Sequence, residues 1–316
     1  MLALLRPHPH RGDVVAAGTV VLTLFVLLVN ARFGSDWDSG VRLLFTAVLA
    51  APVLAMALQA DAGDELPRPY EAVLYVASFV LLLLTLGNLA DALGGEGGPG
   101  TVVWVGLLLM AYCLWFARRR NSAIMTLLAA LTAVVVVIAF VDWVFDIGSA
   151  TTVEWLLLVC ALALTVGAVH QRDARRRHAV SLVDAAGLTI FFLGFIVAVD
   201  VLFTEIFGLL AGGLFGEEGA GFTGGPAGWE LVLLAFGFGL IAYGCVDRER
   251  VPVGIGIAVL SMFLGLAFAP GEGGPSLIGW PIVLALLAVA LLVIGLRPRQ
   301  DLPPEPDVPT LPGAGL

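Results

Sequence analysis

Residues 118–143 read RRRNSAIMTLLAALTAVVVVIAFVDW. Three arginines and a short polar pair are followed by nineteen residues, 123–141, without a single charge. About 20 mainly apolar residues are needed to cross the hydrocarbon core of a bilayer as a helix. Because Arg and Lys are enriched in cytoplasmic loops, the arginine end of this stretch is expected on the inner side. The stretch therefore predicts a transmembrane helix over residues 122–143 with a defined direction.

The whole chain shares this composition. Of its 316 residues 59% are hydrophobic and 13% are charged, and the mean hydropathy is +1.00. A soluble domain is nearer about 45–50% apolar and about 25% charged. The fold class predicted is all-α, a polytopic transmembrane helix bundle that has the lipid bilayer as its main partner. The net charge of −9 argues against nucleic acid as a partner, because phosphate binding needs a basic surface.

Ten apolar runs are long enough to be spans, and we expect them to be arranged as five helical hairpins. The first is expected to be a retained anchor, because no convincing cleavage site follows it. The predicted spans are residues 14–31, 41–59, 71–92, 101–117, 122–143, 151–170, 179–201, 228–246, 251–269 and 276–296.

Orientation follows from the arginines, which are the only basic residues besides four His. With the N-terminus inside, 14 of the 16 Arg fall in inner segments, and only Arg32 and Arg42 fall outside. Both termini are therefore expected in the cytoplasm. The predicted organisation is a cytoplasmic arm over 1–13, the ten-helix domain over 14–297 and a disordered, Pro-rich cytoplasmic tail over 298–316.

The seventh span is longer than a membrane requires. Its helical pattern can run from Val180 to about Gly212, which at 1.5 Å per residue is about 50 Å against a hydrocarbon core of roughly 30 Å. Either the helix projects from the membrane, or residues 202–215 lie along the outer surface.

A glycine-rich motif recurs at outer corners of the chain. GGEGGPG at 94–100 is echoed at 223–226 and 271–275. A phosphate-binding loop would need GxxxxGK[ST] between a strand and a helix, and here there is neither Lys nor strand. We therefore predict a tight outer turn, in which Gly supplies positive φ and Pro stops the preceding helix.

Tryptophans accompany these turns. One Trp falls near the start of each outward-starting helix, as expected for rings at the headgroup level: Trp37, Trp104, Trp155, Trp229 and Trp280. The repetition fits duplication of a hairpin, and it equally fits convergence on the needs common to every hairpin.

The outer side is strongly acidic. Its 13 acidic residues and two Arg give −11, whereas 12 acids and 14 Arg give the inner side +2. Glu154 and Glu230 lie at predicted helix N-termini, where a carboxylate is favoured, and simple capping explains them.

Three aspartates lie instead near predicted helix C-termini, where a negative charge is disfavoured and needs an Arg, a cation, water or protonation to compensate it. They are Asp91, Asp142 and Asp200. Asn88 shares a helical face with Asp91, and Thr204 shares one with Asp200. These five residues are the candidate transport or cation path, and interfacial acids without a role are the alternative. Asp184, deeper on the inner side, is expected to pair with Arg175–Arg177 or His178.

Motifs for catalysis or metal binding are missing from the sequence. There is no HExxH and no GxSxG, and the three Cys are far apart within apolar runs. No catalytic residue, metal site or cofactor is therefore predicted. The loop QRDARRRH at 171–178 suits anionic lipid headgroups, although the ordinary positive-inside signal also accounts for it.

The stretch at 118–190, RRRNSAIMTLLAALTAVVVVIAFVDWVFDIGSATTVEWLLL followed by RDARRRHAVSLVDAAGL, resembles uncharacterised multi-pass integral membrane proteins of GC-rich bacteria. The resemblance implies a bacterial plasma (inner) membrane and carries no activity. In outline, ten helices with both ends inside are similar to the drug/metabolite transporter superfamily, which has inverted five-plus-five repeats. The repeat visible here is a two-helix hairpin instead.

The sequence thus predicts an integral membrane protein without enzymatic activity and of unknown biochemical function. A secondary transporter or cation-coupled permease with an acidic outer vestibule is the first alternative. A membrane scaffold or sensor subunit is the second, and an intramembrane enzyme acting on lipid is the third.

Overall fold

The computed structural model describes residues 12–33, 36–59, 67–95, 97–215 and 227–267, and this part of the chain is all-α. Eight of its helices are long and apolar enough to cross a membrane, and α9 is a shorter apolar helix. The predicted tenth span, residues 1–11 of the predicted arm and the tail over 298–316 lie outside the described residues, whereas Gly12 and Asp13, also assigned to the arm, begin α1. The nine described helices are α1 (Gly12–Phe33), α2 (Ser39–Gln59), α3 (Pro69–Ala92), α4 (Pro99–Arg119), α5 (Ala123–Phe145), α6 (Ala150–Gln171), α7 (Arg176–Phe215), α8 (Ala227–Asp247) and α9 (Arg250–Ala267).

The stretch that opens the sequence analysis forms α5 as predicted. The helix begins after Ser122 and ends at Phe145, where Asp146 adopts a left-handed conformation (φ 50°). Asn and Asp tolerate that conformation better than other non-glycine residues, so the polar residue after the apolar run ends the helix. Asn121, at φ 49°, turns the chain in the same way between α4 and α5.

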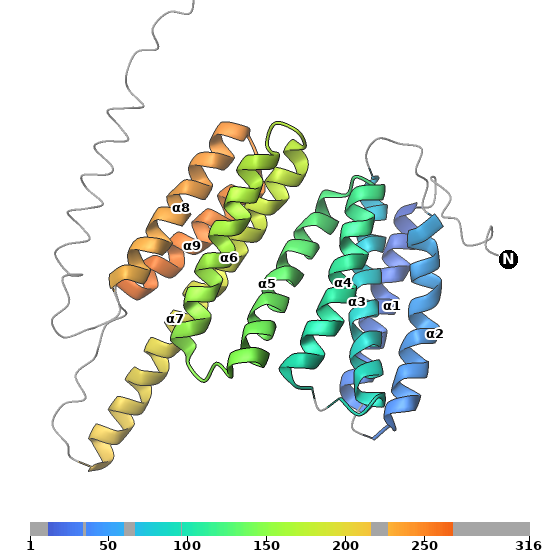
Figure 1. Ribbon diagram of the computed structural model, residues 1–316, viewed down its shortest axis with the longest axis horizontal. Coiled ribbons are helices and arrows are strands. Elements are labelled where there is room, and N and C mark those ends of the chain that lie inside the picture. Colours follow the sequence, from blue (N-terminus) through green and yellow to red (C-terminus); the bar gives the residue numbers. More distant parts are fainter. Residues whose placement is uncertain (1–11, 34–35, 60–66, 96, 216–226, 268–316) are drawn as a thin grey trace, which may run out of the picture.

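Consecutive helices are antiparallel, so their loops alternate between two ends of the bundle (Figure 1). We call the end with loops 120–122, 172–175 and 248–249 the basic end, since these loops and their borders carry most of the arginines. The opposite end, with loops 93–98 and 146–149, is the acidic end.

The helices that pack together along their length are those joined by a loop at the basic end. Packing is extensive between α2 and α3, α4 and α5, α6 and α7, and α8 and α9, whereas helices joined at the acidic end touch little. The hairpins predicted from the sequence were joined by the glycine-rich outer turns, and this pairing is wrong. Three of these packed pairs are joined by basic loops of two to four residues, at 120–122, 172–175 and 248–249. Loop length alone does not decide the pairing, because the outer loop at 146–149 is equally short and α5 and α6 still touch little.

The hairpins line up in an array with two layers. The odd-numbered helices follow one another in contact, α1 with α3, α5 with α7 and α7 with α9, with a lighter contact between α3 and α5. Within the described residues no even-numbered helix packs extensively on another even-numbered helix. The odd-numbered helices therefore form one layer, and each even-numbered helix packs on this layer. We call the space between two successive even-numbered helices a valley.

Glycines allow a close backbone approach between α8 and the segment that follows it, the loop at 248–249 and α9. A Cβ added to Gly256 would lie 2.8 Å from the carbonyl oxygen of Gly237, and one added to Gly244 would lie 2.8 Å from that of Glu249. Only glycine permits backbones to approach so closely, which is how small residues pack helices in lipid.

The turn at 94–98 has the conformation predicted for it. Gly94 and Gly97 have φ of 80° and 67°, and the amide of Gly95 donates to the carbonyl of Ala90 (2.9 Å). Pro99 does not stop α3 but is the first residue of α4, where its missing N–H has no cost. The related motifs at 223–226 and 271–275 lie outside the described residues.

Helix α7 is continuous over 40 residues, which resolves the two interpretations of its second half in favour of a helical extension. At 1.5 Å per residue it is about 60 Å long, about twice the thickness of the hydrocarbon core. Its end projects beyond the neighbouring helices, as Figure 1 shows in yellow. Its span, Arg176–Val201, is also the most buried of the spans, because α5, α6, α8 and α9 all pack against this helix.

Candidate functional site

Asn88, one of the predicted path residues, joins three helices. It is buried in α3, and its Nδ2 donates to Oδ1 of Asn30 in α1 (3.3 Å) and to Oγ1 of Thr46 in α2 (3.2 Å). Hydrogen bonds between side chains of neighbouring helices stabilise packing in lipid. In this arrangement the Asn88 amide acts as a structural cross-link.

Asp91 has an ionic partner. Its Oδ2 lies 3.6 Å from Nη1 of Arg42 in α2, and its side chain is exposed. The compensation expected for a carboxylate in the last turn of a helix is thus supplied by one of the two arginines assigned to the outer side. Asp91 and Asn88 both connect α3 to α2, but they do so with different partners.

Asp142 closes the end of α5. Its Oδ1 accepts a hydrogen bond from the backbone amide of Ile147 (3.2 Å). It also borders a cavity of about 570 Å³ in the valley between α4 and α6, next to Pro99 and Val153. This cavity contains neither Asp91 nor Asp200.

Asp200 lies on α7 with an exposed side chain, and its charge acts on Glu154 of α6. Thr204 follows one turn later in the same helix, and its side chain lies outside the described residues. The structure therefore places Asn88 and Asp91 among the first helices, Asp142 at the end of α5 and Asp200 beside α6. Each of these four side chains has its own surroundings, and the shared path remains a prediction.

The structure corrects the interpretation of Glu154. The N-cap of α6 is Ser149, whose hydroxyl accepts the amide of Thr152 (3.4 Å). Glu154 lies one turn further in, with only 6% of its surface exposed, and it faces the side chain of Trp229. Trp229, in the first turn of α8, is likewise buried. The sequence did offer a sign that Glu154 is not a capping residue, because it lies beyond the first turn of the predicted helix.

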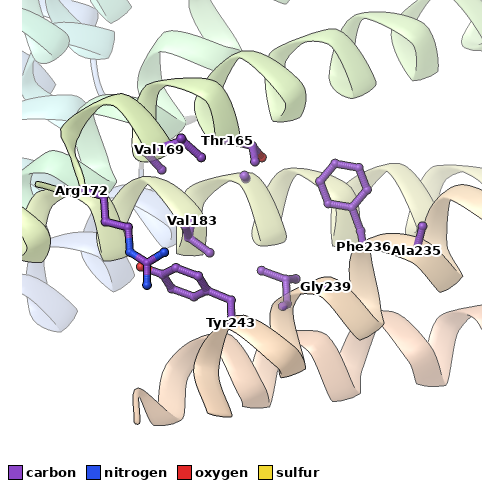
Figure 2. A pocket seen from close by; sticks show the side chains of 11 residues that line it. Thr165, Val169, Arg172, Val183, Ala235, Phe236, Gly239 and Tyr243 are labelled. Atoms are coloured by element: carbon purple, nitrogen blue, oxygen red, sulfur yellow. The ribbon is translucent and has the colours of Figure 1, made fainter. Parts of the chain in front are cut away.

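A groove near the basic end occupies the valley between α6 and α8, with α7 as its floor. Its volume is about 400 Å³. Small and apolar side chains form most of its lining, including Ala168 from α6, Ala186 from α7 and Gly239 from α8. Figure 2 shows Phe236 at one end of the groove and Arg172 with Tyr243 at the other. The groove is therefore apolar along its length and cationic at its mouth.

The mouth is built by three helix ends. Arg172 follows the last residue of α6, Arg176 begins α7 and Asp247 ends α8. Nη2 of Arg172 donates to Oδ1 of Asp247 (2.8 Å), and Nη2 of Arg176 lies 3.7 Å from the same oxygen. Arg176 also donates to the carbonyl oxygen of Asp247 (2.9 Å), which caps the end of α8.

Aromatic contact fixes the position of Arg172 further. Its guanidinium lies 5.8 Å from the centre of the Tyr243 ring, within the range of a cation–π interaction. The Tyr243 hydroxyl approaches the Asp247 carboxylate but forms no hydrogen bond of standard geometry among the described residues.

His178 connects α7 to α5 and to the loop before α5, also at the basic end. Its Nε2 donates to Oδ1 of Asn121 (2.8 Å), and its Nδ1 is hydrogen-bonded to the hydroxyl of Thr126. The predicted pairing of Asp184 with this histidine is therefore not observed. Asp184 is 8% exposed, and its Oδ1 has no hydrogen-bond partner among the described residues.

The chemistry available near the groove is that of binding. An apolar trough that ends at guanidinium groups suits a molecule with a hydrocarbon chain and a polar head. Within the described segments no group of three or more His, Cys, Asp and Glu is arranged to hold a metal ion.

Comparison with known proteins adds no family to these observations. The chain matches no family profile, no curated protein and no solved structure.

Proposed function

We propose that this protein is a non-enzymatic integral membrane protein of the bacterial plasma membrane that binds an amphipathic membrane molecule in the groove between α6 and α8. The hydrocarbon chain of the ligand lies along α7, with its polar end at Arg172. Such a protein would act as a lipid-dependent scaffold or sensor subunit, and its ten spans would place both termini in the cytoplasm.

The observation that carries the proposal is the groove itself. It is bordered by three helices and lined by small residues, so it offers a hydrocarbon chain more contact than the convex face of a single helix does. From Tyr243 to Ala235 it follows α8 for eight residues, or about 12 Å.

Photo-crosslinking tests this proposal. A phosphatidylcholine with a photoactivatable group in its acyl chain is added to the purified full-length protein, and the modified residues are mapped by mass spectrometry. Crosslinks are expected on groove-lining residues such as Thr165 and Phe236. The substitution Gly239→Leu, at a position where an added Cβ meets nothing within 4 Å, should fill the groove and remove them.

Gly254→Leu is the matched control. Gly254 is an exposed helical glycine of α9 with equally open surroundings, away from the groove. Crosslinks spread evenly over lipid-facing residues, or equally reduced by both substitutions, would reject the groove as a site. Crosslinks absent from the groove because residues 276–296 occupy it would reject the proposal as well.

A cation-coupled permease is the second candidate, supported by the interaction of Asp200 with the buried Glu154. It predicts cation or proton uptake into proteoliposomes that Glu154→Gln and Asp200→Asn each abolish. Uptake that is absent in the wild-type protein, or unchanged in both variants, would remove this candidate.

A further inference from the structure

We propose that Arg172 and Arg176, held in place by Asp247, form a phosphate-binding site that makes the groove selective for anionic phospholipid. This inference rests on the proposed binding of a hydrocarbon chain in the same groove and adds the chemical class of the headgroup.

The first argument concerns how the two guanidinium groups are held. Asp247 is the buried member of the cluster, with 7% of its side chain exposed, whereas 48% of Arg172 and 59% of Arg176 are exposed. The carboxylate therefore holds both arginines from the protein side. Two guanidinium charges against one carboxylate leave the cluster with a net positive charge.

The second argument concerns the donors that remain. A guanidinium has five N–H donors, and the hydrogen bonds of Arg172 and Arg176 to described residues use only Nη2 of each. About half of each of these side chains is exposed, so a ligand can reach them from solvent. Planar arrays of such donors match the oxygens of a phosphate, which Arg often binds in a bidentate manner.

The third argument is the depth of the site in the membrane. Three helical segments long and apolar enough to span a membrane, Ala150–Gln171, Arg176–Val201 and Gly228–Asp247, all begin or end at this cluster. A charged cluster at the border of the apolar spans lies at the level where phospholipid phosphates are found, and basic pockets between helices at this level bind anionic headgroups.

Charge around the cluster favours an anionic headgroup over a zwitterionic one. The exposed loop 172–177 carries four Arg against the single carboxylate of Asp173. A phosphatidylcholine would bring a quaternary ammonium into this cationic surface, whereas a phosphatidylglycerol brings only its negative charge. The same molecule can place its chain in the groove, because Arg172 is also a lining residue.

Native mass spectrometry of the full-length protein in detergent tests the selectivity. Phosphatidylglycerol and phosphatidylcholine with identical chains are titrated separately, and their apparent dissociation constants are compared. The wild-type protein should prefer phosphatidylglycerol. In Arg172→Gln/Arg176→Gln this preference should fall by roughly tenfold to a hundredfold, the range expected for hydrogen bonds to a charged group.

Two further variants guard against trivial explanations. Arg118→Gln/Arg119→Gln removes the same charge from the last turn of α4, elsewhere on the basic end, and should keep the preference. Arg172→Gln/Arg176→Gln/Asp247→Asn leaves no unpaired buried carboxylate, so it should fold even where the double variant does not, and it should lack the preference.

Each result decides the matter. An equal loss of preference in the Arg118/Arg119 control would show a diffuse surface charge and overturn the inference, as would an unchanged preference in the triple variant. Saturating glycerol phosphate that displaces phosphatidylglycerol completely would show a site for the soluble anion rather than for lipid. If Gly239→Leu abolishes binding of both lipids while the arginine variants change nothing, the proposed function stands and the phosphate site is rejected.

Discussion

Replacing Gly256 by Ala should weaken the α8–α9 hairpin measurably, because the new methyl group has no room. The added Cβ would lie 2.8 Å from the carbonyl oxygen of Gly237 and 3.1 Å from the amide nitrogen of Ile241. Both atoms belong to the backbone of α8, so no side-chain rotation relieves the contact. The two helices must instead move apart.

The magnitude follows from the size of that movement. Restoring an ordinary contact of about 3.4 Å requires a separation of roughly 0.6 Å, and a gap of this size forfeits about a quarter to a half of the dispersion energy of each contact that it opens. Insertion of a methyl group into a well-packed interface costs about 1–3 kcal/mol. We expect the free energy of unfolding to fall by this amount.

The assay is unfolding in mixed micelles by increasing SDS, followed by circular dichroism. Gly254→Ala is the control in the same helix, because its Cβ would meet nothing within 4 Å and the gain in helix propensity is at most about 1 kcal/mol. Gly237→Ala should fall between the two, since its Cβ would meet the movable side chain of Leu260. Equal stability of the Gly256 and Gly254 variants would refute the reasoning.

Three other predictions concern polar cross-links and topology. Asn88→Leu should lower the free energy of unfolding by about 1–3 kcal/mol in the same SDS titration, through two interhelical hydrogen bonds worth about 0.6–1.7 kcal/mol each; unchanged stability would contradict a cross-linking role. His178→Ala should cost about 1–3 kcal/mol in the same assay by removing two part-buried hydrogen bonds worth about 0.5–1.5 kcal/mol each, and a neutral result would count against it. With the native cysteines replaced by Ala, a cysteine at Gly94 should react with an impermeant maleimide in intact cells and one at Ala174 only after permeabilisation; the reverse pattern would contradict the predicted orientation.

The helices could be predicted from the sequence because an apolar run of membrane length has few alternatives in lipid. Every backbone polar group must be paired within the segment, and a helix achieves this locally. The run at 123–141 therefore formed α5 without information from the rest of the chain, and Gly94 and Gly97 adopted positive φ as a turn of that composition requires. The order of polar and apolar residues along the chain was sufficient for both.

Helix pairing could not be predicted in the same way, because the helices are nearly uniform in composition. Glycine is frequent throughout the chain, and only the tertiary structure distinguishes Gly256, which meets a backbone oxygen, from Gly254, which meets nothing. The glycine-rich outer turns suggested hairpins, whereas the extensive packing is between helices that are joined at the basic end. From the sequence, Glu154 was interpreted as a helix-capping residue. Only the packing of α8 showed that it faces Trp229.

The sequence by itself determined that the chain is a bundle of apolar helices and where most of them begin and end, because these properties depend on local composition. It also showed the arginines of the loop at 172–177. Only the tertiary structure decided that Arg172 and Arg176 meet at Asp247, about 70 residues further along the chain, and that a groove opens beside them. Contacts at such separation depend on which helix faces pack together, and that choice rests on shape rather than on hydrophobicity, which is nearly the same on every face.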